Sequence, residues 1–304
     1  MNRPLMIMMV GLVGSGKSTK AKPIAELYNA NIHSSDSIRE ELSGDINNQD
    51  INELVFKTLH NRIKEDLRNG KNCVYDACNT SYKRRMAFLQ ELKNIPCEKI
   101  CVLMATPYKE CLKNNANRDR VVPEEVIKKM YMNFNIPYWY EGWDDIQIIG
   151  AVNGRYDVGY KVAALADYHQ GNSHHKLTLG WHLWKTRDYY DEICGIDDYD
   201  TAGNVAALLH DISKPFCRTN ANSKGINDGN AHYYNHQYVS AYDSLFINSL
   251  QNKLDVAIRI MWHMQPYFWK KDNNEKSHNK YRKLWGEELY KDIMKLHEAD
   301  LAAH

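Results

Sequence analysis

Short apolar runs alternate with amphipathic stretches over the first 150 residues. The apolar runs predict strands at 5–12, 31–34, 73–76, 99–104 and 146–149. The amphipathic stretches predict helices at 17–27, 50–68, 82–93, 108–115 and 123–133. Because strands that alternate with helices form right-handed βαβ units, we predict an α/β domain with a parallel sheet over residues 1–150.

The alternation of predicted strands and helices stops after residue 150, where the segment NGRYDVGYK contains turn residues. Apolar residues then recur at i, i+3 and i+4 spacing, which predicts helices at 175–188, 202–213, 236–250, 253–264 and 286–303. The segments NDGNAHYYN and KKDNNEKSHNK are polar and indicate loops. Residues 151–304 are therefore expected to form a second, all-α domain.

Composition narrows the class of protein. A chain of 304 residues with 43% hydrophobic and 25% charged residues is typical of a globular protein of two domains. Lys and Arg number 39 against 38 Asp and Glu, and neither half is strongly basic. The chain has no overall excess of positive charge to bind a long nucleic acid, so a nucleic-acid partner would have to be bound by a local site.

The cysteines and the N-terminus indicate a cytoplasmic protein. Seven cysteines form no CxxC pair, and the first residues show no signal peptide. No apolar run approaches the roughly 18–20 residues that cross a bilayer. We expect reduced thiols and no membrane association, and a homo-oligomer is left open.

The segment GLVGSGKS follows the first predicted strand directly and opens a helix. It fits G-x-x-x-x-G-K-[ST], in which backbone N–H groups wrap a triphosphate at a helix N-terminus. Lys17 supplies a charge to the β and γ phosphates, and Ser18 offers a hydroxyl to Mg²⁺. The candidate ATP-binding residues are Gly11, Gly14, Ser15, Gly16, Lys17, Ser18 and Thr19.

Asp36 and Arg39 follow the second predicted strand, at the edge where open α/β sheets bind ligands. Asp36 can accept the proton of an attacking hydroxyl, and a helix N-cap before 37–42 is its alternative role. Arg39 lies one turn further along and can hold a phosphate of the acceptor. Both are therefore candidate catalytic residues.

Two further segments belong at the same edge. Asp76 ends the third strand, where with Asn79 it can orient Mg²⁺ or an acceptor. Arg118 and Arg120 follow the fourth strand in NANRDRVVPEEV and can close over the nucleotide to stabilise the transferred phosphoryl group. Their alternative role is a solvated surface pair.

Residues 1–150 resemble the polynucleotide kinase branch of the P-loop kinases. The resemblance rests on GSGKST, SSDSIR, YDACNTSYKRR and NRDRVVPEEVIKKM, in that order. It implies that Asp36 is the general base, that Arg118 or Arg120 is the lid arginine, and that ATP and Mg²⁺ are used. The substrate-binding set that it implies is Arg39, Asp76, Asn79 and Arg85. Related kinases of small metabolites share GSGKST and the lid, so the acceptor stays open.

Histidines concentrate in the second half. His33 and His60 precede residue 168, and the other eleven follow it. His210 and Asp211 in VAALLHDISKP fall at a predicted helix end, where both can turn toward one ion, although such a dipeptide alone is weak support.

The pattern H…HD…H…H…D across helices resembles the HD phosphohydrolase superfamily over about residues 170–304. It implies one divalent ion on His182, His210, Asp211 and Asp300, and a second on His236, His263 and the shared Asp211. Mn²⁺, Fe²⁺, Ni²⁺ and Co²⁺ all suit such mixed ligands.

The same resemblance implies a phosphate contact from Lys214, as a catalytic group, and a weaker one from Arg218. His175 and His232 are candidate proton donors or phosphate anchors, with packed or surface histidines as the alternative. The remaining histidines are expected to be structural or solvated, namely His169, His174, His278, His297 and His304. His297 lies one turn before Asp300, and its alternative role is to support a metal ligand.

Together the two halves predict a bifunctional enzyme that heals RNA or DNA ends. It would phosphorylate a 5′-hydroxyl and remove a 2′,3′-cyclic phosphate or 3′-phosphate, preparing broken RNA, for example tRNA, for a ligase. One alternative is a nucleoside or metabolite kinase fused to a nucleotide phosphohydrolase. Another is a kinase with a regulatory, nucleotide-sensing HD module.

Overall fold

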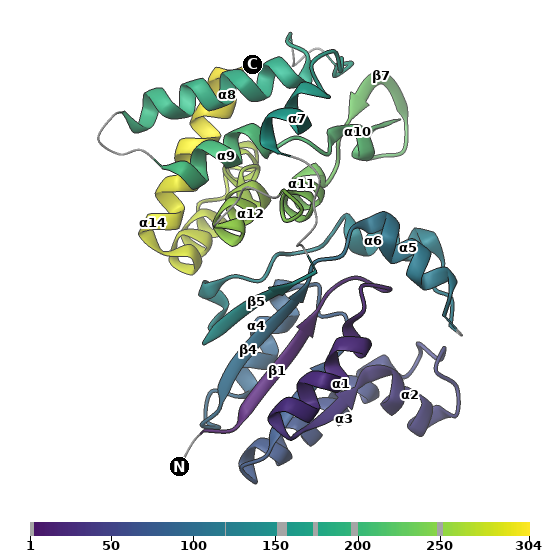
Figure 1. The fold of residues 1–304 in the computed structure, drawn as a ribbon. Helices are drawn as coiled ribbons and strands as arrows, with labels where there is room; N and C mark the ends of the chain where they lie inside the picture. The colour runs from purple at the N-terminus through teal and green to yellow at the C-terminus, as the bar shows by residue number, and fades with distance from the viewer. Residues whose placement is uncertain (1–2, 119, 151–156, 173–175, 196–199, 248–251) are drawn as a thin grey trace. The chain divides into compact units, whose positions relative to one another are not determined.

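The computed structural model describes residues 3–118, 120–150, 157–172, 176–195, 200–247 and 252–304 (Figure 1). The chain divides into two compact units. The first comprises Met1–Met130 and Pro137–Ala151, and the second comprises Tyr131–Ile136 and Val152–His304. Among the described helices, none has both the length and the apolar character needed to cross a membrane.

A five-stranded parallel sheet forms the centre of the first unit. Its strands are β1 (Leu5–Val10), β2 (Ala30–Ser34), β3 (Asn72–Asp76), β4 (Glu98–Met104) and β5 (Asp145–Ile149). They lie in the order β2-β3-β1-β4-β5, and all pairs are parallel. The central strand β1 is wholly apolar because neighbouring strands and helices bury both of its faces. The predicted α/β class is confirmed for this unit.

Helices connect successive strands of this sheet. They are α1 (Lys17–Tyr28), α2 (Ser35–Ser43), α3 (Asn52–Arg68), α4 (Tyr82–Glu91), α5 (Tyr108–Ala116), α6 (Glu124–Tyr131) and the short 3₁₀ turn η1 (Trp139–Glu141). Ala21 and Ala25 of α1 pack with Ile7, Val74 and Val102 of the sheet. The carboxyl ends of β1, β2 and β3 meet at one edge, so the segments that follow these strands converge there.

A buried ion pair joins α4 to η1. Arg85 donates from Nε and NH2 to the two carboxylate oxygens of Glu141, at 2.7 and 2.6 Å, and both side chains are wholly buried. Its NH1 donates to the carbonyl of Asn79 at 2.8 Å, and Trp143 Nε1 also donates to Glu141. The implied substrate contact of Arg85 is therefore wrong, because every donor group of this side chain is committed to the interior. Its neighbour Arg84 is the one that lines the large pocket.

The second unit is mainly helical. Its helices are α7 (Val158–Ala163), α8 (Leu179–Cys194), α9 (Thr201–Leu209), α10 (Lys214–Cys217), α11 (His236–Ser244), α12 (Lys253–Trp262), α13 (Gln265–Lys271) and α14 (Glu275–Ala302). Helix α9 packs against α8 and α12. Gly203 permits the approach to α8, since a Cβ there would lie 1.9 Å from the Tyr190 hydroxyl oxygen.

The expectation of an all-α second half is wrong in one place. Strands β6 (Thr219–Ala221) and β7 (Asn227–His232) form an antiparallel hairpin over part of a segment expected to be a loop. Its turn is held by Asn222, whose Oδ1 accepts from Lys224 N and Ile226 N at 3.0 and 3.1 Å. Turn chemistry rather than an alternating apolar face forms this hairpin, so hydrophobic periodicity gave no sign of it.

Two other boundaries differ from those expected. Helix α14 begins at Glu275 rather than 286, because Asn274 caps it by accepting from Ser277 N, and Gly286 breaks it at φ 79°. The segment Tyr131–Ile136 belongs to the second unit. Its Tyr131 and Phe134 pack edge-on against Tyr242, with ring centroids 5.4 and 4.8 Å apart.

The buried pair yields a stability prediction. Glu141→Gln leaves the Arg85 guanidinium buried without its counter-charge, so the free energy of unfolding should fall by about 3–5 kcal/mol. The exposed pair of Arg62 and Glu41 provides the matched control, Glu41→Gln, which should leave the unfolding midpoint essentially unchanged. Urea unfolding followed by far-UV circular dichroism measures both variants, and equal midpoints would contradict this account of the pair.

Candidate active sites

The first site begins at the loop between β1 and α1. Gly16 is the N-cap of α1 at φ 87°, and Gly14 has φ 77°. A Cβ on Gly14 would lie 2.2 Å from the carbonyl oxygen of Cys111, so only glycine fits there. Lys17 Nζ is held over the loop by the Leu12 carbonyl at 2.6 Å. The loop therefore presents an ammonium group and a helix N-terminus, the arrangement that binds nucleotide phosphates.

Asp76 lies beside this loop at the end of β3. Burial raises the pKa of its carboxyl, while a hydrogen bond from Ser18 and the charge of Lys17 oppose that rise. A buried carboxylate next to the loop hydroxyl provides the oxygen ligands that Mg²⁺ prefers. Asn79 adopts φ 50° and donates to the Met9 carbonyl at 2.9 Å, so this amide orients the loop after β3.

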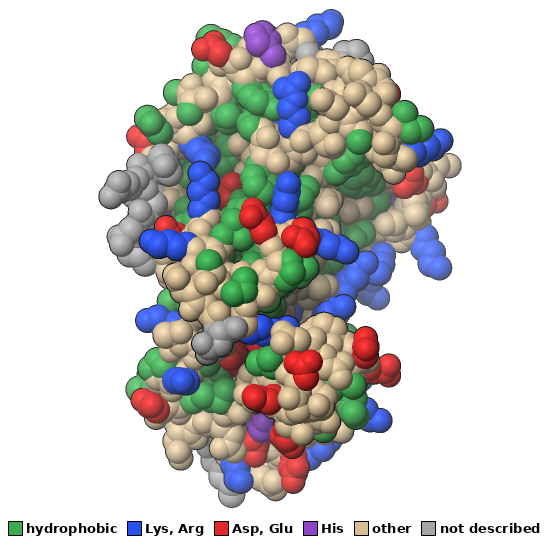
Figure 2. Space-filling model, turned by 90° about the vertical axis from the view of Figure 1, so that its right-hand side faces the viewer, with side chains coloured by type: hydrophobic (Ala, Val, Ile, Leu, Met, Phe, Trp, Pro, Cys, Tyr) green, Lys and Arg blue, Asp and Glu red, His purple; other side chains and the backbone are tan. Residues whose placement is uncertain are grey.

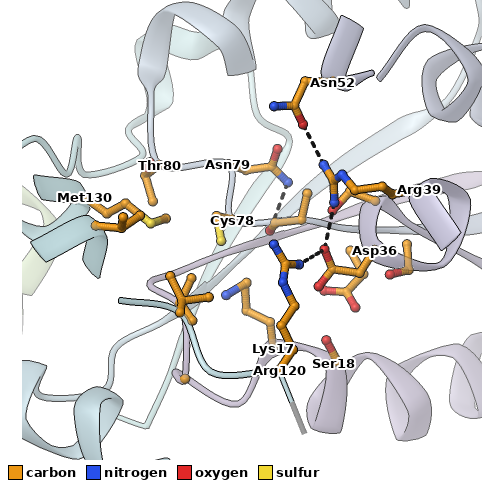
Figure 3. A pocket seen from close by; sticks show the side chains of 18 of the residues that line it. Lys17, Ser18, Asp36, Arg39, Asn52, Cys78, Asn79, Thr80, Arg120 and Met130 are labelled. Carbon is orange, nitrogen blue, oxygen red and sulfur yellow. Dashed lines mark hydrogen bonds and ion pairs between the residues drawn. The ribbon is translucent and has the colours of Figure 1, made fainter. Parts of the chain in front are cut away.

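Arginines converge on Asp36 in the first turn of α2 (Figure 3). Arg39 NH1 lies 3.0 Å and Arg120 NH1 2.9 Å from its Oδ1, and Arg118 NH2 lies 4.0 Å from its Oδ2. The alternative that Asp36 caps the helix is wrong, because Ser34 is the N-cap and accepts from Ser37 N. Both lid arginines reach this carboxylate, and Arg120 is the one that hydrogen-bonds it.

Several residues of this site were missed in the sequence. Asn52 at the start of α3 accepts from Arg39 NH2 at 2.7 Å and fixes the guanidinium from the side opposite Asp36. Phe56 and His60 of the same helix and Arg84 line the pocket too. The i, i+4 spacing of Asn52, Phe56 and His60 on one face of α3 was the available signal.

The pocket that these side chains line belongs wholly to the first unit. It has a volume of about 1260 Å³ and extends from the phosphate-binding loop past Asp36 to α3 and the lid segment. A cavity of this size exceeds the roughly 300–1,000 Å³ typical of small-molecule sites, so it can hold a nucleotide together with an acceptor.

The second site lies inside the helical unit. His182 of α8 approaches Asp300 of α14, with Nε2 3.1 Å from Oδ1, and lies 3.2 Å from Nε2 of His210 at the end of α9. His236 and His263, at the start of α11 and the end of α12, approach Asp211 Oδ1 at 2.9 and 3.8 Å. The six residues expected to ligate metal therefore meet in one buried cluster, and each is at most 8% exposed.

Backbone carbonyls fix the orientation of three of these imidazoles. Nδ1 of His210, His236 and His263 lies 2.8, 2.6 and 2.7 Å from the carbonyl oxygen three residues earlier. A carbonyl oxygen only accepts, so each Nδ1 donates its proton to the backbone, and each Nε2 is turned toward Asp211. Rings held in this way are typical of metal ligands.

The buried carboxylates require positive charge. Oδ1 of Asp211 lies 2.9 Å from His236 Nε2, and Oδ1 of Asp300 lies 3.1 Å from His182 Nε2. Burial raises the pKa of the Asp211 carboxyl, but Lys214 and His210 hold it well below its usual range. Burial lowers the pKa of His210, but Asp211 and Asp300 outweigh this effect and raise it to about 10. Carboxylate and imidazole donors of this kind fit one or two divalent transition ions.

Lys214 and Arg218 are the two expected phosphate contacts, and Lys214 is the one that reaches the cluster. Lys214 Nζ is 2.5 Å from Asp211 Oδ2 and also donates to Gln170 at 2.8 Å, so it stands at the cluster. Arg218 donates to the His169 carbonyl, and its guanidinium lies 5.9 Å from the Tyr168 ring.

His232 is not brought to the cluster, since it pairs with Asp228 at 3.0 Å on the hairpin. His175 lies outside the described residues. His304, expected to be structural or solvated, was missed, because its Nε2 lies 3.4 Å from Asp300 Oδ1.

Fold and site define the first unit as a P-loop domain of the kinase type. Residues 6–137 match the family model described as an AAA domain. The L-seryl-tRNA(Sec) kinase of Methanococcus maripaludis is 28% identical over 145 residues, which cover 46% of this chain and 56% of that protein. The chain thus spans little more than half of this curated relative.

Solved structures show more distant likeness. A putative kinase from Chloroflexus aurantiacus is 14% identical with a TM-score of 0.43, covering 49% of this chain and 86% of its own. A chain of the Pnkp1/Rnl/Hen1 RNA repair complex is 22% identical with a TM-score of 0.37, covering 43% of each chain.

The donor set of the second site predicts metal binding. Protein equilibrated with Mn²⁺ and then desalted should retain about two ions per chain, and Asp211→Ala, which removes a ligand shared by both groups, should retain less than one. His232→Ala removes an imidazole outside the cluster and is the matched control. Elemental analysis gives the ratio, and full retention by Asp211→Ala would contradict the shared-ligand arrangement.

Proposed function

We propose that this protein is a bifunctional enzyme that heals nucleic-acid ends. It phosphorylates 5′-hydroxyl ends with ATP and removes 2′,3′-cyclic phosphate or 3′-phosphate with an HD-type metal centre. The observation that carries the proposal is the joining, in one chain, of a P-loop kinase unit to a buried cluster of four imidazoles and two carboxylates. Broken RNA presents both kinds of end, so one polypeptide can repair both.

The first unit supplies the kinase chemistry. Asp36 accepts the proton of the 5′-hydroxyl while the oxygen of that hydroxyl bonds to the γ-phosphorus of ATP. The bond between that phosphorus and the β-bridging oxygen breaks, and ADP leaves with the electron pair. Lys17 and Arg120 stabilise the negative charge that develops on the transferred group. Arg39, fixed between Asp36 and Asn52, is positioned to bind an acceptor phosphate.

Two findings support an acceptor that is linked to nucleic acid. The pocket has room for more than a nucleotide. The relative from Methanococcus maripaludis is named as a kinase of seryl-tRNA, whose acceptor is part of an RNA-linked substrate. Broken tRNA is therefore a candidate substrate for this chain.

The second unit supplies the hydrolysis. Divalent ions on the cluster would activate water near neutral pH and draw charge from the scissile phosphate. His182, His210, Asp211 and Asp300 would hold one ion, and His236, His263 and Asp211 the other. Lys214, which already meets Asp211 Oδ2, is placed to bind a phosphate oxygen at the edge of the cluster. The resulting 5′-phosphate and 3′-hydroxyl are the ends that a nucleic-acid ligase joins.

Asp36→Asn tests the kinase assignment. Loss of the general base should lower kcat for 5′-phosphorylation about 10²–10⁴-fold and leave ATP affinity nearly unchanged. Glu41→Gln, on the same helix but outside the pocket, is the matched control and should retain the wild-type kcat. Initial rates with labelled ATP give kcat, and an unchanged kcat in Asp36→Asn would remove Asp36 from the chemistry.

Complementary variants test whether the two reactions use separate sites. Lys17→Ala should abolish phosphoryl transfer and leave phosphate removal intact, because Lys17 contacts only the nucleotide phosphates in this account. Asp211→Ala should show the reverse pattern. Both reactions are followed on one RNA oligonucleotide by gel mobility. Consumption of nucleosides or free nucleotides, with no change at RNA ends, would instead support a metabolic kinase joined to a nucleotide hydrolase.

A further inference from the structure

Basic side chains gather on α13 and the first part of α14, although the chain as a whole is nearly neutral. Residues 267–283, called here the α13–α14 surface, carry six Lys or Arg and two Asp or Glu. The rest of residues 151–304 carries 12 basic and 17 acidic side chains. Charges of both signs are interspersed over much of the face in Figure 2. The excess on this short segment is therefore a local feature that the net charge conceals.

The first part of α14 has two distinct faces. His278, Tyr281 and Trp285 face Trp269 of α13, with ring centroids 4.5, 5.9 and 5.5 Å away. Lys276, Lys280 and Lys283 are exposed, and their i, i+4 and i+7 spacing places them along one other face. The aromatic packing thus fixes the helix and orients a row of three ammonium groups toward solvent.

These cations are not neutralised by neighbouring carboxylates. Arg282 pairs with Glu287 at 2.7 Å. Within the described part of the chain, no ion pair involves the other five, namely Lys270, Lys271, Lys276, Lys280 and Lys283. Like charges on one helix face repel one another, and a polyanion would relieve that repulsion.

Exposed aromatic rings accompany the charges. Tyr267 and Phe268 are 42% and 40% exposed, and Lys271 Nζ lies 5.9 Å from the centre of the Tyr267 ring. Trp269, Lys270 and His278 help to line a cavity of about 190 Å³ between α13 and α14. Cations that follow a backbone, with rings on which bases stack, are the combination that binds single-stranded nucleic acid.

We infer that the α13–α14 surface binds the single-stranded part of the polynucleotide substrate, which deepens the proposed function and rests on it for the identity of that substrate. Its position suits this role. Helix α13 begins two residues after His263, and α14 carries Asp300. Along the chain, Lys270 lies seven residues beyond His263, with the break between α12 and α13 in between.

Binding of a fluorescein-labelled, 20-nucleotide single-stranded RNA to the full chain tests this inference. The variant K271Q/K276Q/K280Q/K283Q should bind at least tenfold more weakly at 100 mM salt. The slope of log affinity against log salt should be smaller in magnitude by about 3, since each of the four lost phosphate contacts removes roughly 0.7 from the slope for a single strand. The matched control K71Q/K93Q/K185Q/K224Q removes the same charge from exposed lysines elsewhere and should change affinity less than twofold.

A second variant separates stacking from charge. Y267A/F268A should weaken binding about tenfold and leave the salt slope unchanged, because base stacking does not release counterions. Circular dichroism and thermal melting establish that both variants are folded. Equal losses in the lysine variant and its control would overturn the inference. So would equally strong competition by polyglutamate, which would assign the surface to an acidic protein.

The same variants separate this inference from the proposed function. Turnover of a dinucleotide bearing a 5′-hydroxyl, which lacks the extended strand that the surface is inferred to bind, should be unchanged in K271Q/K276Q/K280Q/K283Q. If the wild-type protein modifies RNA ends and the lysine variant binds RNA normally, the inference fails and the function stands. If the wild type modifies neither substrate while the lysine variant loses RNA affinity, the function fails and the surface stands.

Discussion

Buried carboxylates must be met by positive charge, and both units are organised around this requirement. In the first unit the buried Glu141 is held by Arg85, while the partly exposed Asp36 at the pocket is approached by Arg39 and Arg120. In the second unit Asp211 and Asp300 bring four helices together through their histidines. The pair of Arg85 and Glu141 is a structural one, whereas the carboxylates of the two sites are those that we propose to take a substrate proton or to hold metal ions.

Burial and hydrogen bonding distinguish the residues that stabilise the fold from those that line the candidate sites. The Arg85 side chain is wholly buried and donates to Glu141 and to the Asn79 carbonyl, so it stabilises the fold, while Arg84, one residue earlier, lines the pocket. In the cluster, backbone carbonyls accept hydrogen bonds from Nδ1 of three histidines, so that the Nε2 atoms of these rings face carboxylate oxygens. Carboxylate and imidazole groups gathered in this way fit a divalent metal ion, which is the role that we propose for the cluster.

The sequence predicted what local patterns encode. The phosphate-binding loop has a fixed spacing, the strand and helix alternation follows from burial on both faces of a parallel sheet, and the cluster ligands lie at helix ends. Which side of α4 faces inward was not predictable, because Arg84 and Arg85 are adjacent and only the position of Glu141 decides between them. The hairpin β6–β7 depends on one asparagine turn, and the choice between Arg118 and Arg120 depends on a tertiary contact. A net charge near zero also concealed the basic surface on α13 and α14.

The central claim is that one chain repairs both ends of a broken strand. The most direct test uses a short RNA that carries a 5′-hydroxyl and a 2′,3′-cyclic phosphate, incubated with the protein, ATP, Mg²⁺ and Mn²⁺ and examined by intact mass. The account predicts a product that has gained a 5′-phosphate and whose cyclic phosphate has been opened or removed. An RNA recovered with both ends unchanged, by protein that consumes free nucleosides or nucleotides under the same conditions, would contradict it.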